Sequence, residues 1–128
     1  MSNDSELLQR LLVALRRDLL DGSPERPTVA AVRNTAGFVL SGRAFLAEDG
    51  EEAETLCLTL CRYVKYLIPH VQSPYVVGWT TAFELVRRAE DLLREWHRDG
   101  ASFRMAIRLA GACRDLLKPV SELVGDRL

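Results

Sequence analysis

The sequence predicts an all-α fold, a single-domain bundle of about five helices over residues 1–128. Apolar residues recur at steps of three and four in five stretches of the chain, which is the spacing of one helical face. No stretch alternates apolar and polar residues as a half-buried strand would. Turn-forming residues such as "GSPERP" (residues 22–27) separate the stretches, and 128 residues with 48% apolar content suffice for one core.

Caps and glycines bound the first two helices. Leucines at helical spacing predict a first helix over about residues 5–21, ended by Gly22, since glycine adopts a left-handed conformation there without strain. Thr28 is expected to cap a second helix that runs to about Glu48. A break or a close helix contact is expected near Gly42, because glycine weakens a helix interior.

Prolines bound the next two helices. A third helix is expected from Glu51 to near Ile68, where Pro69 removes a backbone donor and ends it. Ser73 is the expected N-cap of the fourth helix, with a proline at the first helical position, and that helix runs to about Asp99.

The fifth helix is expected over residues 102–118, with Pro119 breaking or kinking it before a short tail helix. The apolar stripes predict which side chains face inward, and these include Leu12, Val39, Leu40, Leu60, Phe83, Leu109 and Leu117. The three cysteines are expected to be buried small apolar residues.

Few reactive groups are available for catalysis, so we expect no enzyme. The two histidines, His70 and His97, lie in a predicted turn and near a predicted helix end, where structural roles are expected. Cys57 and Cys61 share a helical face and could join the histidines in a metal site, but a second close ligand pair is absent. No phosphate-binding or dinucleotide-binding glycine motif is present, and no metal or other cofactor is expected.

Net charge is −1, yet the charges are unevenly distributed along the chain. Residues 26–47, 55–83 and 100–114 contain no acid. Such windows suit contacts with phosphates, although a solvated helix face has the same composition. The cations expected to contact nucleic acid from the first two windows are Arg33, Arg43, Arg62 and Lys65.

A cationic stripe is expected on the fifth helix. At 100° per residue, its four cations occupy roughly a third of the circumference, with only Asp115 among them. These residues are Arg104, Arg108, Arg114 and Lys118. Such a stripe could follow a phosphate backbone.

The stretch "PTVAAVRNTAGFVLSGRAF" (residues 27–45) is superficially similar to the helix-turn-helix of tetracycline-repressor-like regulators. With Gly37 as the turn glycine, however, Arg33 and Arg43 would occupy positions that the motif buries. This departure argues against the motif.

The stretch "RYVKYLIPHVQSPYVVGWTTAFELVRRAEDLLREW" (residues 62–96) resembles the small all-helical subunits of CRISPR effector ribonucleoprotein complexes. In those subunits a helix that ends at an "LP" or "IP" step leads into a short turn and a glycine-bearing apolar helix. Ile68, Pro69 and residues 78–83 follow that pattern. The resemblance implies a non-catalytic role in antiviral defence, with several copies packed beside other subunits and cations contacting guide RNA or the target strand.

Three functional hypotheses follow, of which the third, an enzyme that uses His70 or His97, requires a pocket lined by one of these histidines. The first is a subunit of a nucleoprotein assembly that contacts the backbone of RNA or single-stranded DNA. The second is a partner-binding or regulatory bundle without nucleic-acid contact, which the near-neutral charge and the mixed charges of the fourth helix favour. A cytoplasmic location without membrane contact is expected for each, since no basic leader or long apolar stretch is present.

Overall fold

The computed structural model describes residues 3–20, 28–41, 51–72 and 79–124. In these ranges the chain forms five helices and no strand, as the sequence predicts. They are α1 (Asn3–Leu20), α2 (Val29–Leu40), α3 (Glu51–Val71), α4 (Trp79–Asp99) and α5 (Phe103–Val124).

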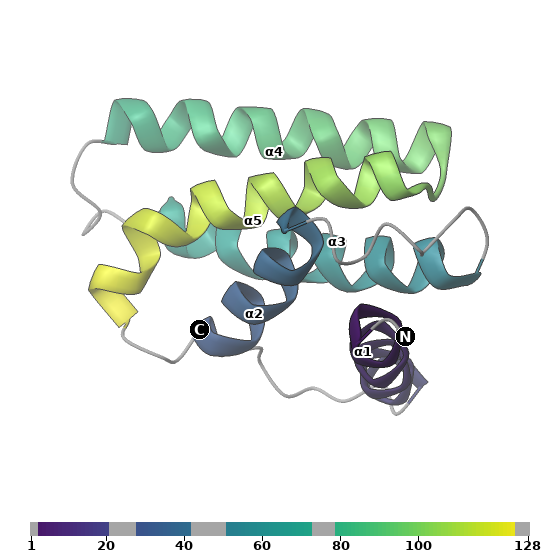
Figure 1. The fold of residues 1–128 in the computed structure, drawn as a ribbon. Helices are drawn as coiled ribbons and strands as arrows, with labels where there is room; N and C mark the ends of the chain where they lie inside the picture. Colours follow the sequence, from purple (N-terminus) through teal and green to yellow (C-terminus); the bar gives the residue numbers. More distant parts are fainter. Residues whose placement is uncertain (1–2, 21–27, 42–50, 73–78, 125–128) are drawn as a thin grey trace.

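Helices α3 and α5 form the centre of the bundle, because each packs against three or more of the other helices. Figure 1 shows α5 between α4 and α3, with α2 crossing α5 at a steep angle. Helix α1 packs on α3, where Arg16 Nε donates to Thr55 Oγ1 at 3.4 Å.

Leucine, valine, alanine and cysteine fill the core. The largest fully buried side chains include Leu12, Val39, Leu60, Val64, Leu109 and Leu116. Cys57, Cys61 and Cys113 are buried as predicted. The helical spacing therefore identifies most of the core correctly.

Two helices continue across a proline, which differs from the predicted end at Pro69 and agrees with the predicted kink at Pro119. Helix α3 runs through Pro69 to Val71, and α5 runs through Pro119 to Val124. Val71 and Val120 lie 1% and 0% exposed, and burying such a side chain is worth about 1.5–3 kcal/mol, enough to offset much of the proline penalty. Figure 1 shows the last turns of α5 bending away from the line of its earlier turns.

Phe83 was predicted to face inward, but its side chain is 65% exposed. Val86 and Ala89 are buried at three-residue steps along the same helix. Each such step turns the position by about 60°, so Phe83 lies about 120° around α4 from Ala89. The predicted apolar stripe was extended one step too far toward the start of the helix.

Helix α2 begins as predicted, with Thr28 Oγ1 accepting a hydrogen bond from the Ala31 N–H at 3.0 Å. It continues through Gly37 to Leu40, so no helix-turn-helix corner occurs at Gly37. Its expected extension over residues 42–48 and the expected cap of the fourth helix at residues 73–78 lie outside the described residues.

A candidate binding surface on α2 and α5

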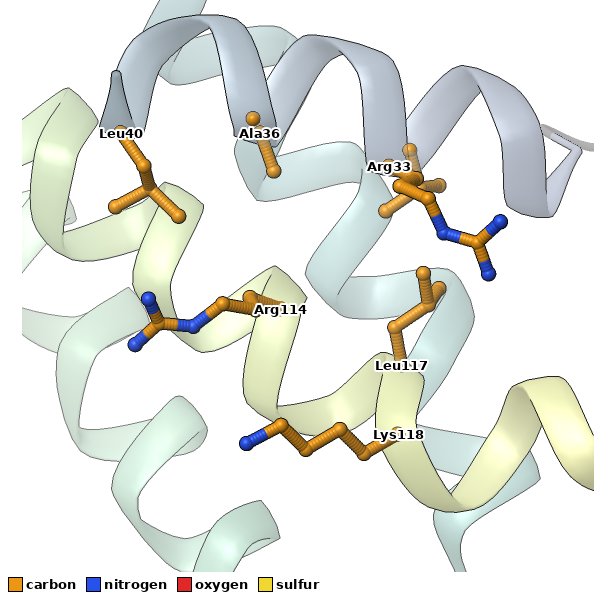
Figure 2. A pocket seen from close by; sticks show the side chains of 8 residues that line it. Arg33, Ala36, Leu40, Arg114, Leu117 and Lys118 are labelled. Atoms are coloured by element: carbon orange, nitrogen blue, oxygen red, sulfur yellow. The ribbon is translucent and has the colours of Figure 1, made fainter. Parts of the chain in front are cut away.

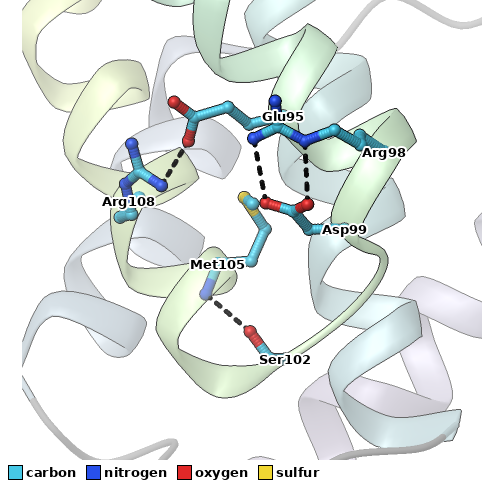
Figure 3. Close-up of polar contacts among 6 residues, drawn as sticks. All are labelled: Glu95, Arg98, Asp99, Ser102, Met105 and Arg108. Atoms are coloured by element: carbon cyan, nitrogen blue, oxygen red, sulfur yellow. Dashed lines mark hydrogen bonds and ion pairs between the residues drawn. The ribbon is translucent and has the colours of Figure 1, made fainter.

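The four cations that the sequence places on one stripe all lie on α5, where Arg108 lines a groove toward α4 and Arg114 and Lys118 line a groove toward α2. All four side chains are exposed: Arg104, Arg108, Arg114 and Lys118. The helix that carries them is capped by Ser102, whose Oγ accepts from the Met105 N–H at 3.0 Å (Figure 3). The prediction that these residues share an exposed face is confirmed, whereas their role stays a prediction.

Acidic side chains pair with Arg108 and Arg114. Arg108 forms an ion pair with Glu95 of α4 (Figure 3), and Arg114 Nε lies 3.6 Å from Asp115 Oδ1. Arg104 forms no ion pair within the ranges that the structure describes. Partly exposed pairs of this kind contribute at most about 1 kcal/mol, so a phosphate can compete with the carboxylates.

A second helix adds a cation to this side of the bundle. Arg33 of α2 is exposed and lines a groove of about 260 Å³ together with Arg114 and Lys118 of α5. Figure 2 shows Arg33 at one end of this α2–α5 groove, while Arg114 and Lys118 extend from α5 toward the other end. Cations from two acid-free stretches of the sequence thus lie around one groove.

The floor of the α2–α5 groove is apolar. Its other lining residues are Val32, Ala36, Gly37, Leu40 and Leu117. No acid is among the described residues that line it. Sequence reasoning found the cations but missed the groove, because the spacing within each helix does not show how α2 crosses α5. Leu117 is buried and Leu40 packs partly buried against the core, as expected, and both also line the groove. Gly37 inside a helix beside Ala36 was the available signal.

The remaining predicted contacts are not brought to this groove. Arg62 and Lys65 lie on α3, where the Arg62 guanidinium carbon is 5.8 Å from the centre of the Tyr66 ring. Lys65 is exposed. Arg43 lies outside the described residues. The structure therefore joins Arg33 to the α5 stripe and leaves the α3 cations on a separate helix.

A second groove, of about 450 Å³, runs between α4 and α5. Its charged lining residues have both signs: Arg88, Asp91, Glu95, Arg108 and Asp115. Near the same helices, Arg88 Nη2 lies 3.3 Å from Glu84 Oε1, and Arg94 pairs with Asp91. The α4 side of the bundle is therefore largely neutralised by its own ion pairs.

The three cysteine thiols lie in buried surroundings that disfavour the thiolate. Burial raises the pKa of the Cys57 thiol to about 11 and also raises the pKa values of Cys61 and Cys113. A reactive cysteine needs the opposite shift, because the thiolate is the nucleophile. His70 is half-buried on α3 and His97 is exposed on α4, and neither lines either groove.

Within the described ranges, no three His, Cys, Asp or Glu side chains lie together as ligands for a metal ion. None of the helices there has the length and apolar character needed to cross a membrane. Comparison with family models, curated proteins and solved structures gives no match.

Proposed function

We propose that the protein is a non-catalytic helical subunit of a cytoplasmic nucleoprotein assembly and contacts the backbone of RNA or single-stranded DNA through α5 and α2. The observation that carries this proposal is the convergence of Arg33 with Arg114 and Lys118 at one groove, beside the exposed Arg104 and Arg108. Arginine suits phosphate because its planar guanidinium donates two parallel hydrogen bonds.

The resemblance of residues 62–96 to CRISPR effector small subunits agrees with this role. Such a subunit works beside other subunits and in several copies, so its own affinity for nucleic acid is modest. Binding by exposed cations is expected to weaken steeply with salt, since each phosphate contact releases condensed counterions.

The test is fluorescence anisotropy with a labelled uridine oligonucleotide of about 20 residues at low salt. The double variant Arg104→Glu with Arg108→Glu is expected to weaken binding by about tenfold or more. Arg87→Glu with Arg94→Glu on α4 makes the same change in net charge and is the matched control. Because a glutamate at position 108 faces Glu95, Arg104→Glu alone serves as a second variant.

Equal loss in the α4 control would mean that only net charge matters, and it would contradict a contact surface on α5. A contact surface on α5 would also be contradicted if the α5 variants bound the oligonucleotide and assembled with other subunits as well as the unchanged protein does.

A second candidate function, a partner-binding bundle without nucleic acid, is favoured by the apolar floor of the α2–α5 groove. Purification from nuclease-treated extract distinguishes the two candidate functions. Retention of a protein partner, with the ultraviolet absorbance ratio of pure protein, supports the second candidate, whereas loss of the partner on nuclease treatment supports the first.

A further inference from the structure

The apolar floor of the α2–α5 groove is not explained by phosphate binding. A phosphate backbone would pair with the cations at the edges and leave the exposed Gly37 and the half-buried Leu40 uncovered. A single-stranded nucleic acid usually covers an apolar protein surface by stacking its bases on aromatic side chains. None of the described residues that line the groove is aromatic. The floor therefore suits aliphatic side chains better than bases.

Gly37 lines the groove and faces open space. A Cβ atom placed on it would meet no atom within 4 Å, so no contact among the described residues requires a glycine there. Glycine in a helix interior costs up to about 1 kcal/mol relative to alanine. The residue lies on α2 next to Ala36, and together they leave space above Leu117 for another molecule.

The positive charges around the groove favour a negatively charged molecule. Arg33 lies at one end and Arg114 with Lys118 toward the other (Figure 2), and no acid lines the groove within the described residues. This surface repels a second copy of itself and attracts carboxylates. From Arg33 to Leu40 the groove follows α2 for about two turns, roughly 10 Å, which matches an apolar stripe at positions i, i+3, i+4 and i+7.

We propose that the α2–α5 groove docks an acidic amphipathic helix of a partner protein. Its apolar stripe lies over Gly37, Leu40 and Leu117, and its flanking carboxylates pair with Arg33 at one end and with Arg114 and Lys118 at the other. The inference goes beyond the nucleic-acid contact proposed above. The two proposals share Arg33, Arg114 and Lys118, whereas Arg104 and Arg108 lie outside the groove and belong to the nucleic-acid contact alone.

The probe is a fluorescein-labelled helical peptide with leucine at i, i+3, i+4 and i+7 and glutamate at the flanking positions. One control peptide replaces the leucines with serine and keeps the charge; another replaces the glutamates with lysine and keeps the leucines. We expect saturable binding of the first peptide, and binding weaker by about tenfold or more for each control.

Two glycines provide matched protein variants. Gly37→Leu fills the α2–α5 groove and is expected to weaken peptide binding by about tenfold or more. Gly111→Leu fills the α4–α5 groove, where a Cβ atom also meets nothing within 4 Å, and it should leave binding unchanged. Arg33→Glu is a second variant for the case that Gly37→Leu does not fold. Arg33 is exposed, so this change should leave the fold intact and weaken binding of the acidic peptide. Circular dichroism reports the fold of each variant.

Three outcomes would overturn the proposal: no binding of the acidic peptide, equal binding of the serine peptide, or unchanged binding in both Gly37→Leu and Arg33→Glu. The proposal would also be overturned if no form of the protein bound the peptide and Gly37→Leu lost binding of the oligonucleotide. That result would assign the groove to nucleic acid. Arg104→Glu separates this failure from that of the proposed function, since it should weaken the oligonucleotide and spare the peptide.

Discussion

The Sγ atom of Cys113 lies 3.6 Å from the carbonyl oxygen of Leu60, so that a thiol of α5 donates to the backbone of α3 at the centre of the bundle. Cys57 makes a similar contact, with Sγ 3.5 Å from the Ser102 carbonyl oxygen. Both contacts are weak hydrogen bonds of buried groups that fill space. The cysteines are therefore part of the packing between α3 and α5.

Stability should fall in alkaline solution because of these thiols. The pKa of Cys57 is raised to about 11 by burial, against an ordinary value near 9. Between about pH 9 and pH 11 the unfolded chain loses this proton and the folded chain keeps it, so the free energy of unfolding decreases as pH rises, by up to about 1.4 kcal/mol per pH unit. Below about pH 9 the stabilising contribution of the protonated Cys57 thiol is fully present. Urea unfolding at several pH values measures the free energy of unfolding and its dependence on pH.

Cys57→Ala is the control for the alkaline effect, and its free energy of unfolding should depend less steeply on pH in the same window. An identical pH dependence in the variant would contradict the raised pKa. In the native protein near pH 8, the thiols should also react much more slowly with a disulfide reagent than in urea, because only about one thousandth of Cys57 is then thiolate.

Gly37→Ala should stabilise the protein by up to about 1 kcal/mol. The new methyl group meets no atom within 4 Å, and alanine loses less conformational entropy in a helix. The matched change is Gly100→Ala, at the end of α4, where the Gly100 N–H donates to the Trp96 carbonyl at 3.0 Å and φ is 81°.

Because that φ is strained for any residue with a Cβ atom, Gly100→Ala should destabilise by about 1 kcal/mol. Thermal unfolding of both variants shows the difference in sign. A destabilised Gly37→Ala would mean that the groove beside it is already filled in solution.

The helical periodicity of the sequence was sufficient for the fold because the core consists of regular stripes, as in Leu56, Leu60, Val64 and Leu67 on α3. It failed at Pro69, because a local rule about proline cannot weigh the burial of Val71 against one lost hydrogen bond. At Pro119 the bend of α5 agrees with the kink that was one of the two expected outcomes. The acid-free windows suggested a common basic side, but helical periodicity does not show that Arg33 and Arg114, far apart in the sequence, line one groove. Only the crossing of α2 over α5 brings them together.

Ser102→Ala should cost about 1 kcal/mol of stability. The serine Oγ accepts from the Met105 N–H, one of the four amide groups at the start of α5 that have no partner within the helix. Alanine leaves that donor without its side-chain acceptor, whereas Ser102→Asp retains an acceptor and adds a favourable charge at the helix N-terminus. Denaturant unfolding compares the variants; equal stability of all three would show that the cap contributes nothing.

The salt dependence of oligonucleotide binding provides the last prediction. If Arg104 contacts one phosphate of a single strand, Arg104→Gln should reduce the slope of log affinity against log salt by about 0.7, because one fewer counterion is released. Arg94→Gln is the control, since Arg94 is exposed on α4 and pairs with Asp91. Anisotropy titrations at four or more salt concentrations measure both slopes. A slope that changes equally in the two variants would indicate a diffuse effect of net charge, and one that changes in neither would remove Arg104 from the contact surface.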